Sequence, residues 1–471
     1  PQRLHPHFLV PTAERGWCSR VLERVDSAAR ETKGNRRTGT VRTQKVREPL
    51  RPRPLRPRPL PSRPMATRET ERGSSGGLPE DMIPEILACL PPKHLLRSRA
   101  ACKAWRNLAT DPAFIGRHHS FQPRQPLVFT YDVGGCLQAV DLATNKRRAV
   151  LRVIQRVPVP RPFADDGRGA LMVHGSCNGL LLLSFHRSFF VCNPATRQGA
   201  RLPLLLQDGR HVVGFYQHAA SGEYRVLYHE AERLGLQSRH SYYVLTVGSP
   251  QARSIDLRTS SAEVGAGLMR GLESSRTSPP VLNGSLHWSP QQSQGGDILV
   301  FDQAAESFRR ISPPAEASLT KDDHTQLFEM EGKLAMFCSP QFAKNMAVWF
   351  MDDYKEMRWV WKYWVKLSFK LAYQPIPLPL CPIVLYQEGD MLVSEEVSDK
   401  VLHCDKTGKS QGPVDCSAGG TRVTPHMLKE SLVLHEFLQT QRNDGACEWF
   451  SEVEFADGSD TAISGDETQT D

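Results

Sequence analysis

The sequence lacks a long uncharged apolar run and lacks regularly spaced cysteines. Its longest apolar stretch, residues 179–192, is interrupted by His186 and Arg187. A membrane-spanning helix needs about 18 or more consecutive apolar residues, so we expect no membrane partner. The 11 cysteines are scattered without a C-x-x-C pair, which excludes a zinc module of the usual spacing and argues against a disulfide framework. We therefore expect reduced thiols and a location in the cytoplasm, the nucleus or both.

Acidic residues are scarce at the N-terminus. Residues 1–64 contain 16 Lys and Arg against 5 Asp and Glu, a net charge of +11, whereas the whole chain carries +8 and the remainder therefore −3. This segment is rich in proline and has no apolar periodicity, so we expect residues 1–77 to be disordered, with polyproline II character near residues 51–60. Such an arm could bind nucleic-acid phosphates or an aromatic-lined groove. The first methionine is Met65, however, and we expect translation to start there, so we assign no nucleic-acid partner.

Residues 78–120 contain the clearest helical pattern in the chain. Ile83, Ile86, Leu87 and Leu90 recur at the spacing of one helix face, and two prolines then end the helix. We expect a second helix over Lys93–Thr110. The pair Asp111-Pro112 predicts a third, short helix, with the aspartate as N-cap and proline in the first helical position. Isolated units of about 40 residues rarely bury enough apolar surface to be stable, so these helices require a partner.

This segment resembles an F-box, the module by which substrate receptors dock onto the adaptor subunit of cullin-RING ubiquitin ligases. The resemblance rests on Leu78-Pro79, Leu90-Pro91, Leu95-Leu96-Arg97 and Cys102-Lys103-Ala104-Trp105-Arg106, which stand in the family's order and at about its spacing. Ala101 departs from the pattern, since the family often has valine there. The resemblance implies that a set of mostly apolar residues faces the adaptor or holds the helices that do. They are Leu78, Pro79, Ile83, Ile86, Leu87, Leu90, Leu95, Cys102 and Trp105.

From residue 121 to about residue 440 the pattern changes to short apolar runs separated by Gly, Pro, Asn and Asp, which is typical of an all-β domain. A loose repeat recurs within it, in which a turn with glycine opens a strand and a later strand ends in Asp or Asn. Four copies run from Asn178-Gly179 to Asn193, Asn283-Gly284 to Asp302, Glu331-Gly332 to Asp352, and Glu388-Gly389 to Asp405, with a degenerate copy from Gly134-Gly135 to Asp141.

Repeats 45 to 60 residues apart, each able to supply three or four strands, predict a propeller of roughly five or six blades. We expect residues 431–435 to return and complete the first blade. The segments 175–180, 193–196 and 429–432 also resemble the F-box-associated β domain of plant receptors. Residues 441–471 are strongly acidic and are expected to form a disordered tail. The fold class is therefore α+β and multi-domain, with a small all-α unit, an all-β propeller-like domain and disordered termini.

Several residues of the β domain could carry chemistry. Residues 175–179 have the G-x-C-x-G spacing of a nucleophile elbow with Cys177 as the attacking atom, but the apolar run that follows predicts a strand where that motif needs a helix. The histidines show no metal-ligand spacing, and neither His118-His119 nor His403-Cys404 makes a metal site. The acid pairs 165–166, 322–323 and 352–353 fall in predicted turns, where aspartate bonds the nearby backbone.

Tryptophan is concentrated in one repeat, at positions 349, 359, 361 and 364. With a period of two, Trp359, Trp361 and Tyr363 fall on a single face of a strand. They could line a ligand groove or pack between two blades, and we favour packing.

The combined pattern predicts a substrate-recognition subunit of a Skp-cullin-F-box ubiquitin ligase. Its F-box would dock a Skp-type adaptor, and through it the cullin, while its β domain would hold a target protein. We expect no catalysis, cofactor or metal. The alternative is a β-propeller hydrolase or a ligand-binding module that is not linked to ubiquitination.

Overall fold

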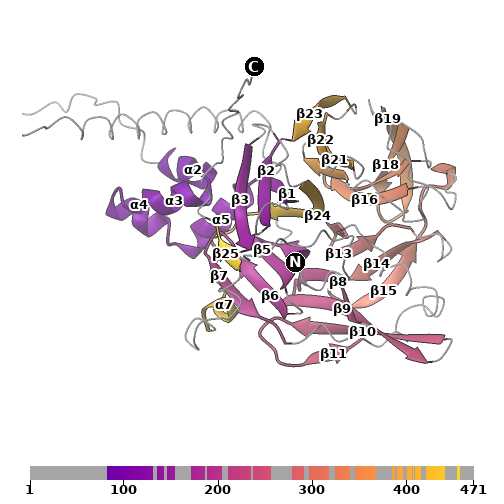
Figure 1. Cartoon of the computed structure of the whole chain (residues 1–471), viewed down its shortest axis with the longest axis horizontal. Helices are drawn as coiled ribbons and strands as arrows, with labels where there is room; N and C mark the ends of the chain where they lie inside the picture. Colours follow the sequence, from indigo (N-terminus) through magenta and orange to yellow (C-terminus); the bar gives the residue numbers. More distant parts are fainter. Residues whose placement is uncertain are drawn as a thin grey trace, which may run out of the picture. The chain divides into compact units, whose positions relative to one another are not determined.

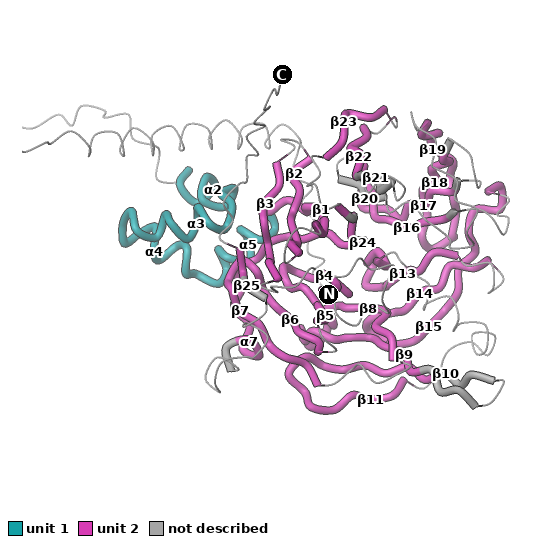
Figure 2. The backbone as a smooth tube through the Cα atoms, viewed as in Figure 1, with its two compact units in different colours: residues 1–121 teal, residues 122–471 magenta. Residues whose placement is uncertain are grey.

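The structure is a computed structural model, and it divides into two compact units, residues 1–121 and 122–471 (Figure 2). It describes residues 82–456 outside a set of internal segments. These are residues 131–134, 143–145, 154–170, 186–187, 204–209, 235–236, 256–277, 291–295, 318–323, 340–344, 367–383, 388–389, 396–399, 406, 408, 415–420 and 441–452. The predictions for residues 1–77, for Leu78-Pro79 and for residues 457–471 lie outside the described residues.

Four short helices make up the described part of the first unit. They are α2 (Met82–Cys89), α3 (Pro92–Ser98), α4 (Lys103–Leu108) and α5 (Pro112–Phe121). The first and last were predicted correctly, and the Asp111 carboxylate accepts the Phe114 N–H at 2.9 Å as the N-cap of α5. The continuous second helix was wrong, because the chain leaves helical geometry after Ser98 and restarts at Lys103. Cys102 is extended there, and its Sγ accepts the Trp105 N–H at 3.4 Å as the N-cap of α4.

Helix α5 packs against α2 and fixes its end. Arg117 on α5 pairs with Glu85 on α2, and His118 Nε2 lies 2.7 Å from the Leu90 carbonyl oxygen that follows α2. Burial, the largest influence, lowers the pKa of His118, so this fully buried ring is favoured as the neutral form. A helix-terminal carbonyl is thereby satisfied by a side chain 28 residues further along.

In its described residues, the second unit forms six antiparallel sheets that follow one another around a ring (Figure 1). Five sheets each contain four consecutive strands. The second sheet contains β4 (Met172–Cys177), β5 (Leu180–Phe185), β6 (Ser188–Asn193) and β7 (Gln198–Arg201). The third contains β8 (Arg210–Gln217), β9 (Tyr224–Leu234), β10 (Gln237–Thr246) and β11 (Ala252–Ser254).

The remaining sheets repeat this plan. The fourth contains β12 (Val281–Leu282), β13 (Ser285–Trp288), β14 (Ile298–Asp302) and β15 (Ser307–Ile311). The fifth contains β16 (His324–Met330), β17 (Lys333–Ser339), β18 (Asn345–Asp353) and β19 (Arg358–Lys366). The sixth contains β20 (Val384–Gln387), β21 (Asp390–Glu395), β22 (Lys400–Cys404) and β23 (Ser410–Val414). A 3-10 turn, η4 (Ala315–Ala317), and a short helix, α7 (Glu436–Thr440), complete the described elements.

The first sheet joins both ends of the unit, in the order β24-β1-β2-β3-β25. It combines β1 (Arg124–Thr130), β2 (Cys136–Asp141) and β3 (Lys146–Val153) with β24 (Thr421–Lys429) and β25 (Val453–Phe455). The fold is thus a six-bladed, propeller-like all-β domain. The expected closure by residues 431–435 was wrong, since the closing strand ends at Lys429. The expected disorder of the tail does not hold for residues 453–455, which pair with β3.

Buried apolar clusters lie between each sheet and the next and close the ring. One buried pair represents each interface: Leu137 with Leu181, Leu182 with Val226, Tyr242 with Phe301, Val300 with Met336, Phe337 with Met391, and Leu392 with Val140. Consecutive residues such as Leu181 and Leu182 face opposite sides of one strand and so enter different clusters. This explains why the middle strands read as continuous apolar runs.

The predicted glycine turns are confirmed where the structure describes them. Asn178 and Gly179 have φ values of 50° and 88°, and Asn283-Gly284 and Glu331-Gly332 repeat this pair of positive values. Hairpin turns with two positive φ angles match the twist of the flanking strands, which is why Asn-Gly is favoured there. The fourth copy, Glu388-Gly389, lies outside the described residues.

A second turn recurs after the third strand of a blade. The side-chain Oδ1 atoms of Asn193, Asp302, Asp353 and Asp405 each accept two backbone N–H groups further along the chain. The sequence repeat had placed Asp352 in this role. The structure uses Asp353 instead, because Asp352 pairs with Lys333 and Arg358 across the sheet.

Candidate functional site

The residues expected to contact an adaptor occupy two environments in the helical unit. Four of them are buried and hold the helices together: Ile86, Leu87, Leu90 and Leu95, with exposures of 8%, 1%, 5% and 0%. Three others reach the surface: Cys102 is exposed, and Ile83 and Trp105 are half-buried. Leu78 and Pro79 lie outside the described residues. Of the described set, the second group alone offers surface to a partner.

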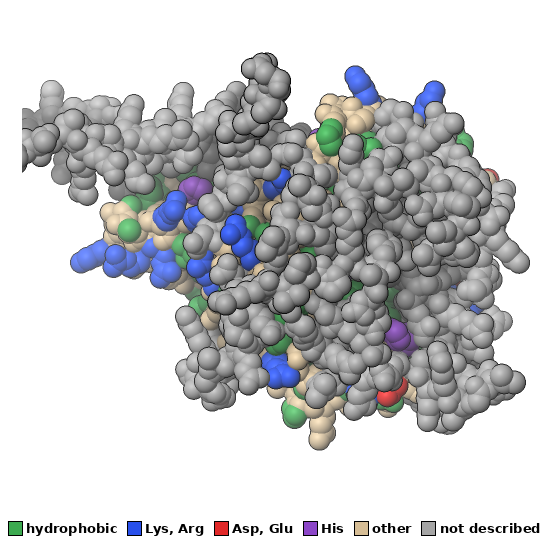
Figure 3. All heavy atoms as spheres, in the orientation of Figure 1, with side chains coloured by type: hydrophobic (Ala, Val, Ile, Leu, Met, Phe, Trp, Pro, Cys, Tyr) green, Lys and Arg blue, Asp and Glu red, His purple; other side chains and the backbone are tan. Residues whose placement is uncertain are grey.

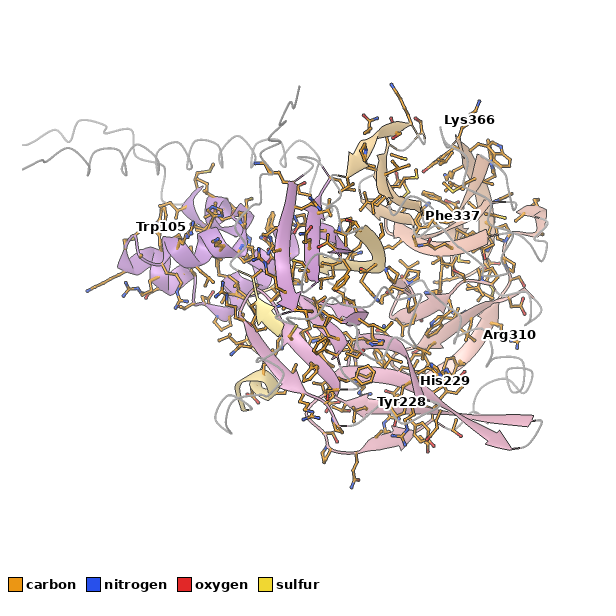
Figure 4. The ribbon with its side chains drawn as sticks, viewed as in Figure 1. Trp105, Tyr228, His229, Arg310, Phe337 and Lys366 are labelled. Carbon is orange, nitrogen blue, oxygen red and sulfur yellow. The ribbon has the colours of Figure 1, made fainter. Side chains whose placement is uncertain are left out.

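Trp105 lies on the short helix α4 of the helical unit (Figure 4). Its backbone N–H is capped by Cys102, and its own carbonyl accepts the Ala109 N–H at 2.9 Å as the short helix ends. No residue of α4 is buried, so this helix is not part of the unit's core. A helix of six residues with an incompletely covered tryptophan presents an apolar surface that a partner can cover.

Leu96 is a surface residue of the same unit that sequence reasoning left out of the candidate set. Its side chain on α3 is 38% exposed, while Leu95 beside it is fully buried. The helical period carries the signal, because adjacent residues differ by about 100° around a helix and cannot share a face. Lys and Arg side chains gather over the described helices (Figure 3), and the sequences of α3 and α4 include Arg97, Lys103 and Arg106. The two helices therefore carry both surface apolar residues and basic residues.

The geometry around Cys177 does not make a nucleophile elbow. Strand β4 ends at Cys177, the Asn178-Gly179 turn follows, and strand β5 begins at Leu180, so a hairpin stands where the elbow needs a helix. Burial is the main cause that raises the pKa of the Cys177 thiol to about 12, and a backbone hydrogen bond with Gln217 acts in the opposite direction. The thiol stays protonated at neutral pH, and the thiolate is the nucleophilic form.

Three histidines of the second unit make structural contacts. His174 Nε2 lies 2.7 Å from Ser184 Oγ, and His426 Nε2 lies 3.0 Å from the Val173 carbonyl oxygen. Burial lowers the pKa of His174 to about 3 and that of His426 to about 4, so both rings are neutral at physiological pH. His403 lies on β22 beside Cys404 and contacts Asp390 at 2.9 Å. Across the described part of the chain, His, Cys, Asp and Glu form no group of three or more that could hold a metal ion.

The tryptophan-rich strand β19 differs from its predicted arrangement. A register shift in its pairing with β18 places Lys362 in a bulge, so Tyr363 opposes Val348 and Trp364 opposes Ala347. Tyr363 therefore faces away from Trp359 and Trp361, and Trp364 joins them on their side. Packing is confirmed for Trp349, which is 8% exposed, whereas Trp361 and Trp364 remain 45% and 57% exposed.

Two family profiles match the chain. The F-box domain matches residues 76–115, and the F-box associated beta propeller domain matches residues 155–424. The helical unit and the ring of six sheets thus define the class as an F-box followed by a propeller. The chain belongs to the family of F-box proteins that carry the F-box associated β-propeller domain.

Its relatives include plant F-box proteins. The Arabidopsis thaliana F-box protein At3g07870 is 26% identical over 311 residues, which are 60% of this chain and 71% of the relative. The F-box/kelch-repeat protein At3g23880 from the same plant is 24% identical over 373 residues, 76% of this chain and 96% of the relative. Rice protein ABERRANT PANICLE ORGANIZATION 1 is 31% identical over 132 residues, 27% of this chain and 29% of the relative. None of the described helices is long and apolar enough to cross a membrane.

Proposed function

We propose that this protein is a substrate-recognition subunit of a Skp-cullin-F-box ubiquitin ligase. Its helical unit binds a Skp-type adaptor, which connects it to the cullin, and its propeller holds a target protein. The match of residues 76–115 to the F-box, directly before a propeller of the F-box associated family, carries this proposal. The free thiols of the described cysteines fit a location in the cytoplasm or nucleus, where such thiols stay reduced.

The helical unit has separate buried and surface residues, and this arrangement supports the proposal. Leu87 and Leu95 form the core that positions the short helices, while Leu96, Cys102 and Trp105 lie at the surface. An interface gains most of its affinity from a few aromatic and apolar residues that become fully covered on binding. Trp105 is the largest such side chain on the described surface of the unit.

The protein contributes to ubiquitination by proximity and performs no bond-forming step itself. Holding a target near the transferring enzyme converts an encounter between two molecules into a step within one complex. The hydrolase alternative loses its main candidate, because the Cys177 thiol is buried, protonated and followed by a hairpin. Of its carboxylate candidates, Asp352 forms ion pairs and Asp353 accepts turn hydrogen bonds, while the pairs 165–166 and 322–323 lie outside the described residues.

Binding of the full chain to a purified Skp-type adaptor, measured by calorimetry, tests the proposal. Trp105→Ala should lower the affinity at least tenfold, since truncation of a central interface aromatic costs about 2 kcal/mol or more. Leu96→Glu should do the same with little effect on folding, because its side chain is already exposed. A Leu78→Ala, Pro79→Ala double variant should also lose at least tenfold.

Trp364→Ala is the matched control, since it removes an exposed tryptophan from the propeller. It should bind the adaptor as the unaltered chain does. Unchanged adaptor affinity in both Trp105→Ala and Leu96→Glu would refute the assignment of this surface.

A further inference from the structure

Strand β19 carries an unusual concentration of exposed apolar side chains. Among the described residues, eight large apolar side chains are exposed, and four of them lie in the segment from Met357 to Trp364. They are Met357, Val360, Trp361 and Trp364, with exposures of 44%, 36%, 45% and 57%. Scattered exposed apolar residues are normal, but a cluster with two tryptophans on one strand marks an interaction surface.

The bulge in β19 brings the two tryptophans to the same side. Trp361 opposes Trp349 and Trp364 opposes Ala347, and both of these partners belong to the buried cluster between the fourth and fifth sheets. Directly opposed residues in an antiparallel pair project from the same face. Without the extra residue Lys362, Trp364 would project from the opposite face, so the bulge aligns the pair.

β19 is also the edge of its sheet. The order is β16-β17-β18-β19, and in the described structure β19 pairs with β18 alone. An edge strand presents a row of backbone donors and acceptors, and an extended peptide can add to it as a further strand. With nine residues, β19 is long enough to hold such a peptide while its tryptophans contact alternate side chains.

The charge of this edge selects its partner. Strand β19 itself, residues 358–366, contains three basic residues and no acid. Arg358 pairs with Asp352, which leaves Lys362 and Lys366 as the basic residues of this edge. Residues 65–471 as a whole carry −3. Lys366 extends outward from the end of β19 (Figure 4). Two copies of a basic edge repel one another, so the charge disfavours pairing between copies of this chain and favours an acidic segment.

We propose that β19 is a docking edge for an extended acidic segment of the target protein. The segment adds as a strand beside β19, places apolar side chains against Trp361 and Trp364, and places carboxylates near Lys362 and Lys366. This inference rests on the proposed function, because it names the chemical class of target segment that the propeller holds.

Fluorescence anisotropy with the full chain tests the docking edge. The probe is a labelled ten-residue peptide in which Glu alternates with Val, and the reference peptides carry Lys in place of Glu or N-methyl groups on alternate amides. The acidic peptide should bind at least tenfold more tightly than either reference. Its affinity should fall at least fivefold in a Trp361→Ala, Trp364→Ala double variant, and Lys362→Glu, Lys366→Glu should reverse the preference for charge. Met172→Ala, at an equally exposed apolar residue of β4, should change nothing.

Three outcomes would overturn the docking edge. They are equal affinity for the acidic and basic peptides, unchanged affinity in the tryptophan double variant, or a dimer of this chain that sedimentation detects and the double variant abolishes. Adaptor affinity is measured on the same preparations. Loss of adaptor binding with peptide binding retained would refute the ligase assignment alone, and the reverse result would refute the docking edge alone.

Discussion

The Asn193 side chain joins two parts of the chain that are 238 residues apart, since its Nδ2 donates to the Ser431 carbonyl oxygen at 3.0 Å. The same amide donates to the Val433 carbonyl oxygen at 3.4 Å, and its Oδ1 accepts the N–H groups of Ala195 and Thr196. Asn193 is fully buried. The turn of the second blade thus holds the segment that follows the closing strand β24.

Asn193→Asp should destabilise the propeller by about 3 kcal/mol, because a carboxylate keeps the turn bonds but faces two carbonyl oxygens from a buried position. Urea unfolding monitored by fluorescence measures the change. Asp302→Asn is the control, since Asp302 occupies the same turn and only accepts backbone N–H groups there. It should change stability by less than about 0.5 kcal/mol. Equal effects of the two substitutions would show that the contact with Ser431 is not important.

Gly179→Ala should lower the unfolding free energy more than the same substitution at an equivalent turn. Gly179 has φ +88°, and an added Cβ would overlap the Ser431 Cβ and lie 2.8 Å from the Ser431 backbone nitrogen. Gly284 has φ +69° with open space around a Cβ, so Gly284→Ala carries the backbone strain alone. We expect a difference of about 1–3 kcal/mol between the two variants in unfolding free energy, from overpacking against Ser431. Equal losses would mean that the 431–435 segment moves aside at no cost.

The free energy of unfolding should decrease as the pH falls below the ordinary pKa of histidine. Burial holds the pKa of His174 at about 3 and that of His426 at about 4, below the value of 6.5 expected when the chain is unfolded. Between these values the unfolded chain binds protons that the folded chain does not, so acidification favours unfolding. The full contribution is present above about pH 6.5, and it is lost progressively as the pH falls from there toward the folded-state pKa values.

Urea unfolding midpoints at pH 7.5, 6.5, 5.5 and 4.5 measure how steeply the stability changes with pH. A His174→Gln, His426→Gln double variant should reduce this slope, while His118 and His287, whose pKa values burial also lowers, keep part of it. High salt should leave it largely unchanged, because desolvation rather than long-range charge is the main cause. A slope that is the same in the double variant would assign the pH dependence to other groups.

Turns, helix caps and buried strands, which depend on local sequence patterns, were mostly predicted from the sequence. The Asn178-Gly179 turn, the Asp111 cap and the buried run from Leu180 to Leu183 follow from backbone preference and apolar spacing, and all three are present in the structure. The number of blades followed only approximately, because one copy of the repeat is degenerate and no copy was recognised in the third sheet, β8 to β11. These features depend on neighbours in the chain and so can be read from it.

The errors arose where one residue changes the register. Lys362 forms a bulge, so Trp364 rather than Tyr363 lies on the same face as Trp361. A strict alternation of side chains along the strand cannot predict this bulge. The closing strand β24 was not predicted, and it contains Pro425, a residue type that usually argues against a paired strand. The structure accommodates Pro425 beside a register shift opposite Pro126 and Val128, where Thr424 Oγ1 donates to the Leu127 carbonyl oxygen at 2.9 Å. The break before α4 depended on Cys102 as N-cap, which is not among the usual capping residues.

Hydrogen–deuterium exchange of the full chain, with and without a Skp-type adaptor, tests the central claim most directly. The account predicts that amides of α3 and α4 exchange at least tenfold more slowly in the complex, while the propeller strands, including β19, keep their rates. Unchanged exchange in α3 and α4, or protection confined to the propeller strands, would contradict it.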